Sequence, residues 1–214
     1  MIGVPERSGE RDAVIRATLR HVPFDGWTMR AVRAGLAELG EPAEMGSNLF
    51  PDGPLGLVEA WSDLADREME AAAGGIGEVG LTLRLRALIA LRLQMLRPHR
   101  EAVRRAVAVL GQAGAARTAT RIMARTVDSI WHAAGDKAAD FSWYTKRASL
   151  AAIYGATVLY WLADQSEEEA ATLAFLDRRL GQVAAFGRLR RNLKVWPRGF
   201  AGCRRDVAAH QDAT

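Results

Sequence analysis

Cysteine is almost missing from this sequence, whose 214 residues contain only one, Cys203. A single cysteine excludes a disulfide framework and a thiolate zinc site, and it is typical of proteins from reducing compartments. Long apolar runs are missing too: no window of about 20 residues is free of charge, as a membrane-spanning helix would require. Any contact with a membrane is therefore expected to be peripheral.

The residue patterns of common catalytic sites are also lacking. Di-iron helical bundles need Glu-x-x-His pairs, but no glutamate lies three residues before any of the four histidines, His21, His99, His132 and His210. Asp128, His132 and Asp136 are spaced by four, yet Gly135 is expected to end their helix before the third residue aligns. We find no Gly-x-Ser-x-Gly elbow, no P-loop and no dinucleotide fingerprint. The sequence predicts no catalysis, no metal and no cofactor.

The overall composition is that of a globular protein with a core, at 49% hydrophobic and 25% charged residues. The net charge of +4 favours an anionic partner, with nucleic acid, a membrane surface and an acidic protein all open. Residues 1–10 are polar and contain no apolar segment, which predicts neither a signal peptide nor a transit peptide.

Apolar residues recur at helical spacing along most of the chain. Pro23 is expected to close the first helix, Thr28 to cap the second, and Pro42 to open the third. In all, about nine helices are predicted, over residues 10–22, 29–39, 42–48, 54–73, 78–96, 103–110, 122–134, 143–161 and 166–183. Because no linker separates them, we predict one continuous all-α domain with three parts: 10–50, 54–186 and a basic tail, 187–214.

Two of these helices carry specific signals. Near the start of the stretch 78–96, leucines alternate with other residues as they would in a strand. A run of 19 residues without a turn is, however, too long for a strand. Leucines on several sides predict that this helix is buried on most of its circumference, with its arginines extending to solvent. Before the last helix, Ser166 and Glu169 have the spacing of a capping box.

The stretch from Asp128 to Arg147 is unusually dense in aromatic and charged residues. It joins two apolar helices, so these side chains gather at one corner between helices. Aromatic rings beside bases are typical of a protein-protein hot spot or the rim of an apolar pocket. The alternative is an architectural corner with buried tryptophans, in which Asp136 or Asp140 caps a helix.

The last 30 residues change character, and from Phe186 they are predicted to form a short basic amphipathic helix, which Pro197 ends. Such a helix suits an anionic membrane surface, each base adding about 1 kcal/mol. The alternative is a solvated tail that Phe186 and Leu189 pack onto the bundle. The predicted membrane-binding residues are Arg188, Leu189, Arg190, Arg191, Leu193, Lys194 and Trp196.

Residues 10–50 resemble the helix-turn-helix head of the TetR-family regulators, with Gly26-Trp27-Thr28 leading into a second helix and a turn at Gly40. This resemblance implies, as an alternative function, a transcription regulator that binds DNA and a small apolar effector. The third helix, however, contains Glu41 and Glu44 and no lysine or arginine, so it would repel the DNA backbone. We therefore predict a TetR-like fold without nucleic-acid binding.

The chain as a whole, from about Arg11 to Arg191, resembles the Coq-nine family, the lipid-binding accessory proteins of ubiquinone biosynthesis. The most specific motifs are Val22-Pro23 with Gly26-Trp27-Thr28, Arg92–Leu96 before Pro98, Trp131–Asp136, Asp140–Arg147 and Phe175–Arg179. The resemblance implies a dimeric, non-catalytic protein. Such a protein takes an isoprenoid lipid or ubiquinone precursor from the membrane and presents it to the demethoxyubiquinone hydroxylase, a di-iron enzyme.

Site residues follow from the resemblance and the helix pattern together. The hydroxylase-facing surface would comprise Asp140, Trp143, Tyr144, Lys146 and Arg147. The lipid pocket is expected at Leu85, Leu88, Met95, Trp131, Tyr154 and Val158. Eukaryotic relatives have a longer and more apolar membrane helix than the basic segment here, so a weaker, salt-dependent membrane contact is expected. A bacterial member, peripheral on the cytoplasmic side of the inner membrane, fits these features.

Overall fold

The computed structural model describes residues 5–77, 80–135 and 142–193, with side chains in the last range from 144 to 183. Over these residues the chain forms ten α-helices and three short 3-10 helices, and no strand. The prediction of an all-α fold is confirmed for these residues. No helix in the described part of the chain is long and apolar enough to cross a bilayer.

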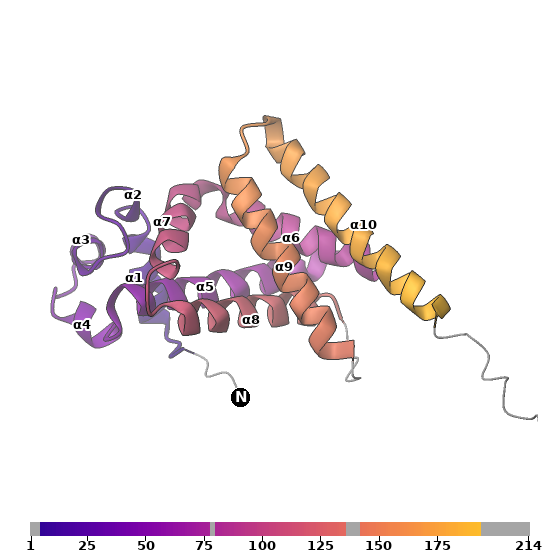
Figure 1. Cartoon of the computed structure of the whole chain (residues 1–214). Helices are drawn as coiled ribbons and strands as arrows, with labels where there is room; N and C mark the ends of the chain where they lie inside the picture. The colour runs from indigo at the N-terminus through magenta and orange to yellow at the C-terminus, as the bar shows by residue number, and fades with distance from the viewer. Residues whose placement is uncertain (1–4, 78–79, 136–141, 194–214) are drawn as a thin grey trace, which may run out of the picture.

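Four short helices form a head at one end of the molecule (Figure 1): α1 (Gly9–Thr18), α2 (Val22–Asp25), α3 (Met29–Leu39) and α4 (Met45–Leu49). Ser8 caps α1 and Thr28 caps α3, each accepting a hydrogen bond from a backbone N–H of the first turn. The predicted role of Thr28 is confirmed. Gly40 ends α3 in the left-handed conformation, with a φ of 74°.

Two predicted boundaries in the head are wrong. The first helix ends at Thr18, and Pro23 lies in the first turn of α2 instead of closing α1. Proline is tolerated there because the first-turn N–H groups have no helical partner. Pro42 does not open the third helix either: its carbonyl accepts a turn hydrogen bond from Met45, where α4 begins.

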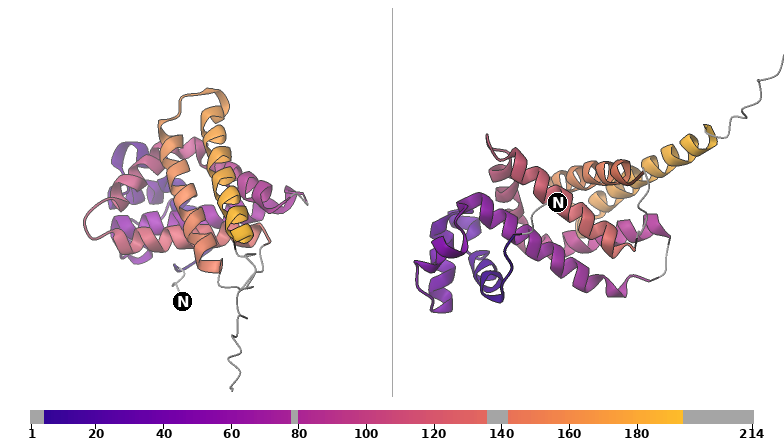
Figure 2. Two further views of the ribbon diagram at one scale, coloured as in Figure 1. Left: turned by 45° about the vertical axis from the view of Figure 1, so that its right-hand side comes forward. Right: turned by 90° about the horizontal axis from the view of Figure 1, so that it is seen from below.

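The remaining helices form the body: α5 (Gly53–Ala72), α6 (Leu81–Leu96), α7 (Arg100–Leu110), α8 (Ala116–Ala133), α9 (Ser142–Ala163) and α10 (Ala170–Leu193). Helix α5 lies beside α8, α9 packs across α8, and α10 packs against α9 and α6 (Figures 1 and 2). The C-terminal part of α10 extends beyond the bundle. Trp27 joins the two parts, because its indole N–H donates to the Ala102 carbonyl at 2.9 Å and its ring centroid lies 4.9 Å from that of Trp61.

Helix α6 differs from its prediction at both ends. Leu83 in the first turn is 56% exposed, so this end is not enclosed. Arg92, expected to extend to solvent, is only 4% exposed and pairs with Asp66 of α5. Helical spacing identifies the inner face of α6 but cannot show that a carboxylate from another helix lies next to that face.

The start of α10 uses a different cap from the predicted capping box. Ser166 accepts a hydrogen bond from the backbone N–H of Ala171, five residues on, instead of from the first turn that follows it. Glu169 does not reach back to it and instead pairs with Arg97, N to O, at 3.0 Å. Asp164 supplies the missing cap, since its carboxylate accepts from the backbone N–H groups of Ser166 and Thr172.

Candidate functional site

An apolar cavity of about 280 Å³ lies among five helices of the body, α5 to α9. We call it the inner cavity. Its walls include Trp61, Leu96, Val103, Ile122, Met123 and Val158. Its volume is close to the lower limit of ligand pockets, about 300 Å³. Leucine, valine and isoleucine around a space of this size favour an apolar ligand over water.

The inner cavity has a deep end and an open end. Val58, Thr126 and Tyr154 form the deep end and are buried. At the other end, Val107 and Leu159 line the cavity and also face solvent, with Leu159 58% exposed. Apolar side chains at an opening suit a ligand that enters from an apolar medium.

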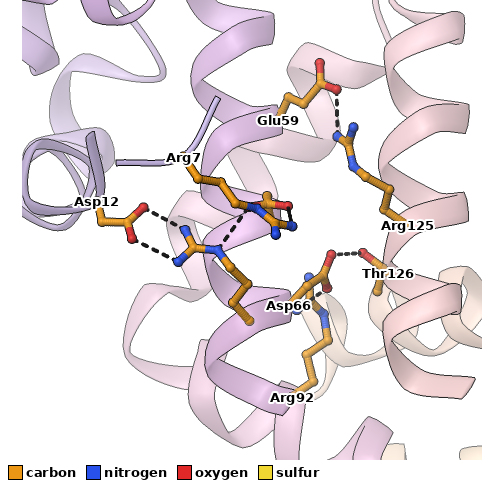
Figure 3. Close-up of polar contacts among 9 residues, drawn as sticks. Arg7, Asp12, Glu59, Asp66, Arg92, Arg125 and Thr126 are labelled. Carbon is orange, nitrogen blue, oxygen red and sulfur yellow. Dashed lines mark hydrogen bonds and ion pairs between the residues drawn. The ribbon is translucent and has the colours of Figure 1, made fainter. Parts of the chain in front are cut away.

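A buried polar cluster adjoins the inner cavity, and three of its residues, Arg92, Thr126 and Tyr154, line it. Its four residues, Asp66, Arg92, Thr126 and Tyr154, come from α5, α6, α8 and α9 respectively. Arg92 Nη1 lies 2.7 Å from Asp66 Oδ1, and Arg92 Nε donates to the Tyr154 hydroxyl at 2.7 Å. Thr126 donates to the other oxygen of Asp66 at 3.0 Å (Figure 3). The cluster therefore ties together four of the helices that enclose the cavity.

Burial governs the titration of this cluster. It raises the pKa of Asp66 to about 6, although the Arg92 guanidinium and the Thr126 hydroxyl both favour the carboxylate. Burial also raises the pKa of Tyr154, so its hydroxyl stays protonated. At neutral pH the wall of the cavity thus contains a charged but mutually neutralising Asp66–Arg92 pair.

Further acidic residues of α5 fix its position (Figure 3). Glu59 pairs with both Arg121 and Arg125 of α8, each at 2.6 Å. Although burial opposes it, hydrogen bonds from these two arginines hold the pKa of Glu59 below its usual value. Asp63 is bound by Arg7 at 2.6 Å and by Arg67 at 3.1 Å.

These acids were not identified from the sequence. The available signal was their spacing, because Glu59, Asp63 and Asp66 recur every three or four residues and so share one side of α5. When one helix is considered without its neighbours, such a row of acidic residues is typical of a face exposed to solvent. Only the packing of α6 and α8 against it reveals that the stripe is buried.

A second hollow, of about 570 Å³, lies on the surface between α8 and α9. We call it the outer groove. Its lining includes Ala119, Met123, Val127, Tyr144, Arg147 and Ala151. Its walls are mostly apolar, and an ion pair crosses it, with Arg147 Nε 2.5 Å from Asp128 Oδ1. Met123 lines both the outer groove and the inner cavity, so the two hollows are neighbours.

The predicted pocket residues fall in three places. Tyr154 and Val158 line the inner cavity. Met95 lines a smaller and more polar hollow beside Arg16 and His99. Leu85, Leu88 and Trp131 are buried in the core of the body and are not among the residues around either hollow.

The predicted partner residues are only partly described. Tyr144 is 75% exposed, and it lines the outer groove together with Arg147. Lys146 Nζ lies 5.9 Å from the centre of the Trp131 ring, within cation–π range. Asp136 and Asp140 lie outside the described residues, as does the side chain of Trp143.

The predicted membrane segment continues α10. Arg188, Leu189, Arg190, Arg191 and Leu193 belong to its last turns, whose side chains are outside the described part. Lys194 and Trp196 lie outside the described residues altogether. Among the side chains that are described, no group of three or more histidine, cysteine, aspartate or glutamate residues could hold a metal ion.

A solved structure supports the fold. The crystal structure of a TetR transcriptional regulator from Nitrosomonas europaea superposes with a TM-score of 0.66, covering 83% of this chain and 99% of the regulator, at 24% identity. At this identity the likeness establishes the fold alone.

Sequence comparisons identify the family. A family model described as COQ9 matches residues 116–187. Proteins named ubiquinone biosynthesis protein COQ9, mitochondrial, are similar over most of this chain: the Drosophila melanogaster protein is 35% identical over 81% of it, and the human protein 31% over 85%. The chain spans 55% and 59% of the lengths of these two relatives. It covers 76% of the Schizosaccharomyces pombe protein, at 30% identity. The chain therefore belongs to the COQ9 family of ubiquinone biosynthesis proteins.

Proposed function

We propose that this protein is a non-catalytic accessory protein of ubiquinone biosynthesis, which binds an isoprenoid quinone precursor and presents it to the demethoxyubiquinone hydroxylase. The observation that carries the proposal is the apolar inner cavity between α5 and α9, with an opening lined by Val107 and Leu159. Membership of the COQ9 family connects this cavity to the ubiquinone pathway.

The chemistry of the cavity supports an isoprenoid ligand. Each methylene equivalent transferred from water into such a cavity contributes about 0.8 kcal/mol, so several carbons suffice for useful affinity. The charges beside the cavity neutralise each other, since Asp66 lies 2.7 Å from Arg92. A hydrocarbon tail therefore leaves no buried charge without a partner.

The proposed partner surface adjoins the outer groove. Tyr144 is exposed there, and an exposed aromatic ring beside basic residues is typical of interface hot spots. In the proposal Trp143 and Tyr144 provide the apolar contact, and Asp140, Lys146 and Arg147 orient the enzyme. The basic end of α10 contacts the membrane surface, and two copies of the chain form a dimer.

The test is to purify the protein, extract bound lipid and identify it by mass spectrometry. We expect an isoprenoid or a phospholipid in repeated preparations. A variant with a filled cavity, Val158→Trp, serves as the matched control and should release much less lipid. Repeated recovery of no lipid from the unaltered chain would count decisively against the proposal.

The TetR-like fold makes DNA binding the second candidate. The region of α4 argues against it, because Glu41 and Glu44 are exposed there and residues 41–49 include no lysine or arginine. We expect no salt-dependent binding to palindromic DNA in a mobility-shift assay. Specific binding to one sequence would favour the regulator instead.

A further inference from the structure

The hollow beside Arg16 and His99, of about 270 Å³, lies where the head meets the body, and we call it the junction hollow. Arg16 and Leu19 of α1 form one wall, and residues of α5 and α6 form the others. Four side chains line both the junction hollow and the inner cavity: Trp61, Ala65, Arg92 and Leu96. The two spaces therefore share a wall, and a ligand in the inner cavity lies next to the junction hollow.

The polar groups of the junction hollow differ in whether they already have partners. Arg16 and Glu68 bind each other, N to O, at 2.8 Å. The ring of His99 is only partly buried and makes no hydrogen bond or ion pair with the residues that the structure describes. Arg92 uses Nε and Nη1 in the buried polar cluster, and its Nη2 has no hydrogen-bond partner in the described part of the chain. An imidazole and one guanidinium nitrogen are therefore available to a ligand.

The charges around the junction hollow favour an uncharged ligand group. Its two ion pairs, Arg16–Glu68 and Arg92–Asp66, are each neutral overall. Burial lowers the pKa of His99, so its imidazole is neutral at neutral pH. A carboxylate or phosphate in this hollow would have no counter-charge left to pair with, and burial of an unpaired charge is costly. A hydroxyl or carbonyl oxygen needs only hydrogen-bonding groups, which both free nitrogens supply.

The sizes of the two spaces suit a ligand with an apolar chain and one polar end. The inner cavity alone, at about 280 Å³, lies below the usual range for a drug-sized ligand, about 300 to 1,000 Å³. The junction hollow adds a space of similar volume with polar walls. Ala65 has the smallest side chain of the shared wall, so a chain that spans both spaces meets the least bulk there.

We propose that the junction hollow is a second subsite, in which His99 and Nη2 of Arg92 bind an uncharged hydroxyl or carbonyl group of a ligand whose apolar chain lies in the inner cavity. This inference rests on the proposed function and adds the place of the ligand's polar end. The hydroxyl of an isoprenoid alcohol and the carbonyl of a quinone ring share this chemistry. Because Leu19 belongs to α1, a ligand bound in this way contacts the head as well as the body.

The first test compares geraniol, an isoprenoid alcohol of ten carbons, with myrcene, a ten-carbon hydrocarbon without the hydroxyl group, by titration calorimetry. His99→Phe keeps an aromatic ring and removes its hydrogen-bonding nitrogens. It should weaken geraniol binding about tenfold, or about 1.4 kcal/mol, and leave myrcene within about twofold. His132→Phe, at an exposed histidine that lines neither the junction hollow nor the inner cavity, is the matched control and should change neither affinity.

A second variant fills the junction hollow. Met95 lines this hollow and not the inner cavity, so Met95→Trp should weaken geraniol binding about tenfold and leave myrcene within about twofold. Gln94→Trp, at the exposed neighbouring residue outside both spaces, is the matched control. Thermal unfolding of each variant is measured alongside, so that a misfolded Met95→Trp is recognised and the result of His99→Phe decides alone.

Two further ligands define the group that the junction hollow accepts. Geranic acid, which is a carboxylate at pH 8, should bind the unaltered chain at least about tenfold more weakly than geraniol. A short-chain ubiquinone is titrated against His99→Phe and the unaltered chain. A loss of affinity for the ubiquinone as well as for geraniol assigns the hollow to quinone rings, whereas a loss for geraniol alone assigns it to isoprenoid alcohols.

The remaining outcomes overturn the subsite. If the unaltered chain binds geraniol and myrcene, and His99→Phe weakens neither or both equally, the subsite is wrong and the proposed function stands. If geranic acid binds as tightly as geraniol or more tightly at pH 8, the hollow does not select an uncharged group and the proposal is wrong. If the unaltered chain binds none of these ligands, including the ubiquinone, the proposed function fails as well.

Discussion

The head and the body of this protein are built from the same kind of helix but pack in opposite ways. In the head, Gly35 of α3 lies so close to α1 that a Cβ there would be 2.8 Å from the backbone nitrogen of Thr18. In the body, five helices enclose a cavity of about 280 Å³. Close packing of backbones needs glycine, whereas a cavity needs side-chain contacts that hold the surrounding helices apart.

The polar cluster of the body provides that support. Asp66, Arg92, Thr126 and Tyr154 each belong to a different helix, and the ion pair and two hydrogen bonds among them fix the distances between these helices. Hydrophobic collapse alone would tend to close an empty space of this size, because atoms around a void lose contacts. The comparison shows that close backbone packing holds the head together, whereas a buried ion pair and its hydrogen bonds support the body around its cavity.

The largest effect should follow from breaking the buried pair of the body. Asp66→Leu leaves the buried guanidinium of Arg92 without a counter-charge, so the free energy of unfolding at neutral pH should fall by about 3 to 5 kcal/mol. Changing both residues, Asp66→Leu with Arg92→Met, should recover most of this loss. Urea denaturation measures both.

The exposed pair Arg86–Asp177 is the control, because its N–O distance of 2.6 Å is close to the 2.7 Å of the buried pair. Asp177→Leu should cost no more than about 1 kcal/mol, since exposed ion pairs contribute little. An equal loss for Asp66→Leu and Asp177→Leu would show that the buried pair does not support the body.

The next effect concerns the close packing of the head. Gly35→Ala forces a Cβ against the backbone of α1 and should lower the free energy of unfolding by about 1 to 3 kcal/mol. Gly9→Ala, where an added Cβ meets open space, is the matched control and should cost nothing. A Gly35→Ala variant as stable as Gly9→Ala in thermal melts would contradict the close approach of α1 and α3.

A third change separates the two parts by function. Val158→Trp fills the inner cavity and should reduce lipid affinity at least about tenfold, or about 1.4 kcal/mol, in a lipid titration. Gly35→Ala should leave that affinity unchanged below its melting temperature, because the head does not line the cavity. If both changes weaken binding equally, the head and body are coupled more strongly than their separate packing suggests.

The smallest effect should appear on acidification. The pKa of Glu59 is lower in the folded protein than in the unfolded chain, because Arg121 and Arg125 bind its carboxylate. The stability it contributes is therefore present above the unfolded pKa and is lost as the pH falls through the folded pKa. In the Glu59→Gln variant, the free energy of unfolding should fall by about 0.5 kcal/mol less on acidification below pH 5 than in the unaltered chain. An unchanged slope in acid would indicate that this pair contributes nothing measurable.

Much of the fold followed from local pattern. Thr28, Gly40 and Gly135 mark helix ends in the sequence, and in the structure Thr28 caps α3 while the two glycines adopt left-handed φ angles near helix ends. These signals act within one turn of backbone, so neighbouring residues suffice to read them. At Glu169 a distant residue, Arg97, provided a different partner. At Pro23 the proline fitted the first turn of a second helix as well as the end of the first.

The candidate site was harder to predict from the sequence than the fold. Tyr154 and Val158 were placed at the cavity because helical spacing puts them on the inner face of α9. Leu85, Leu88 and Trp131 have equally apolar patterns but lie in filled core. Whether an apolar face borders a hollow or a solid interior depends on side chains of other helices, which spacing along one helix does not reveal.

The sequence by itself determined that this chain is helical, that it resembles the COQ9 family and where most helices end, because hydrophobic periodicity and capping are local properties. Only the tertiary structure decided that Arg92 turns inward, that the acids of α5 are buried, and that a cavity and a groove meet at Met123. Those features depend on ion pairs, hydrogen bonds and voids between different helices, such as the ion pair of Asp66 with Arg92 and the hydrogen bond of Thr126 to Asp66, 60 positions apart. They exist only once the helices have packed.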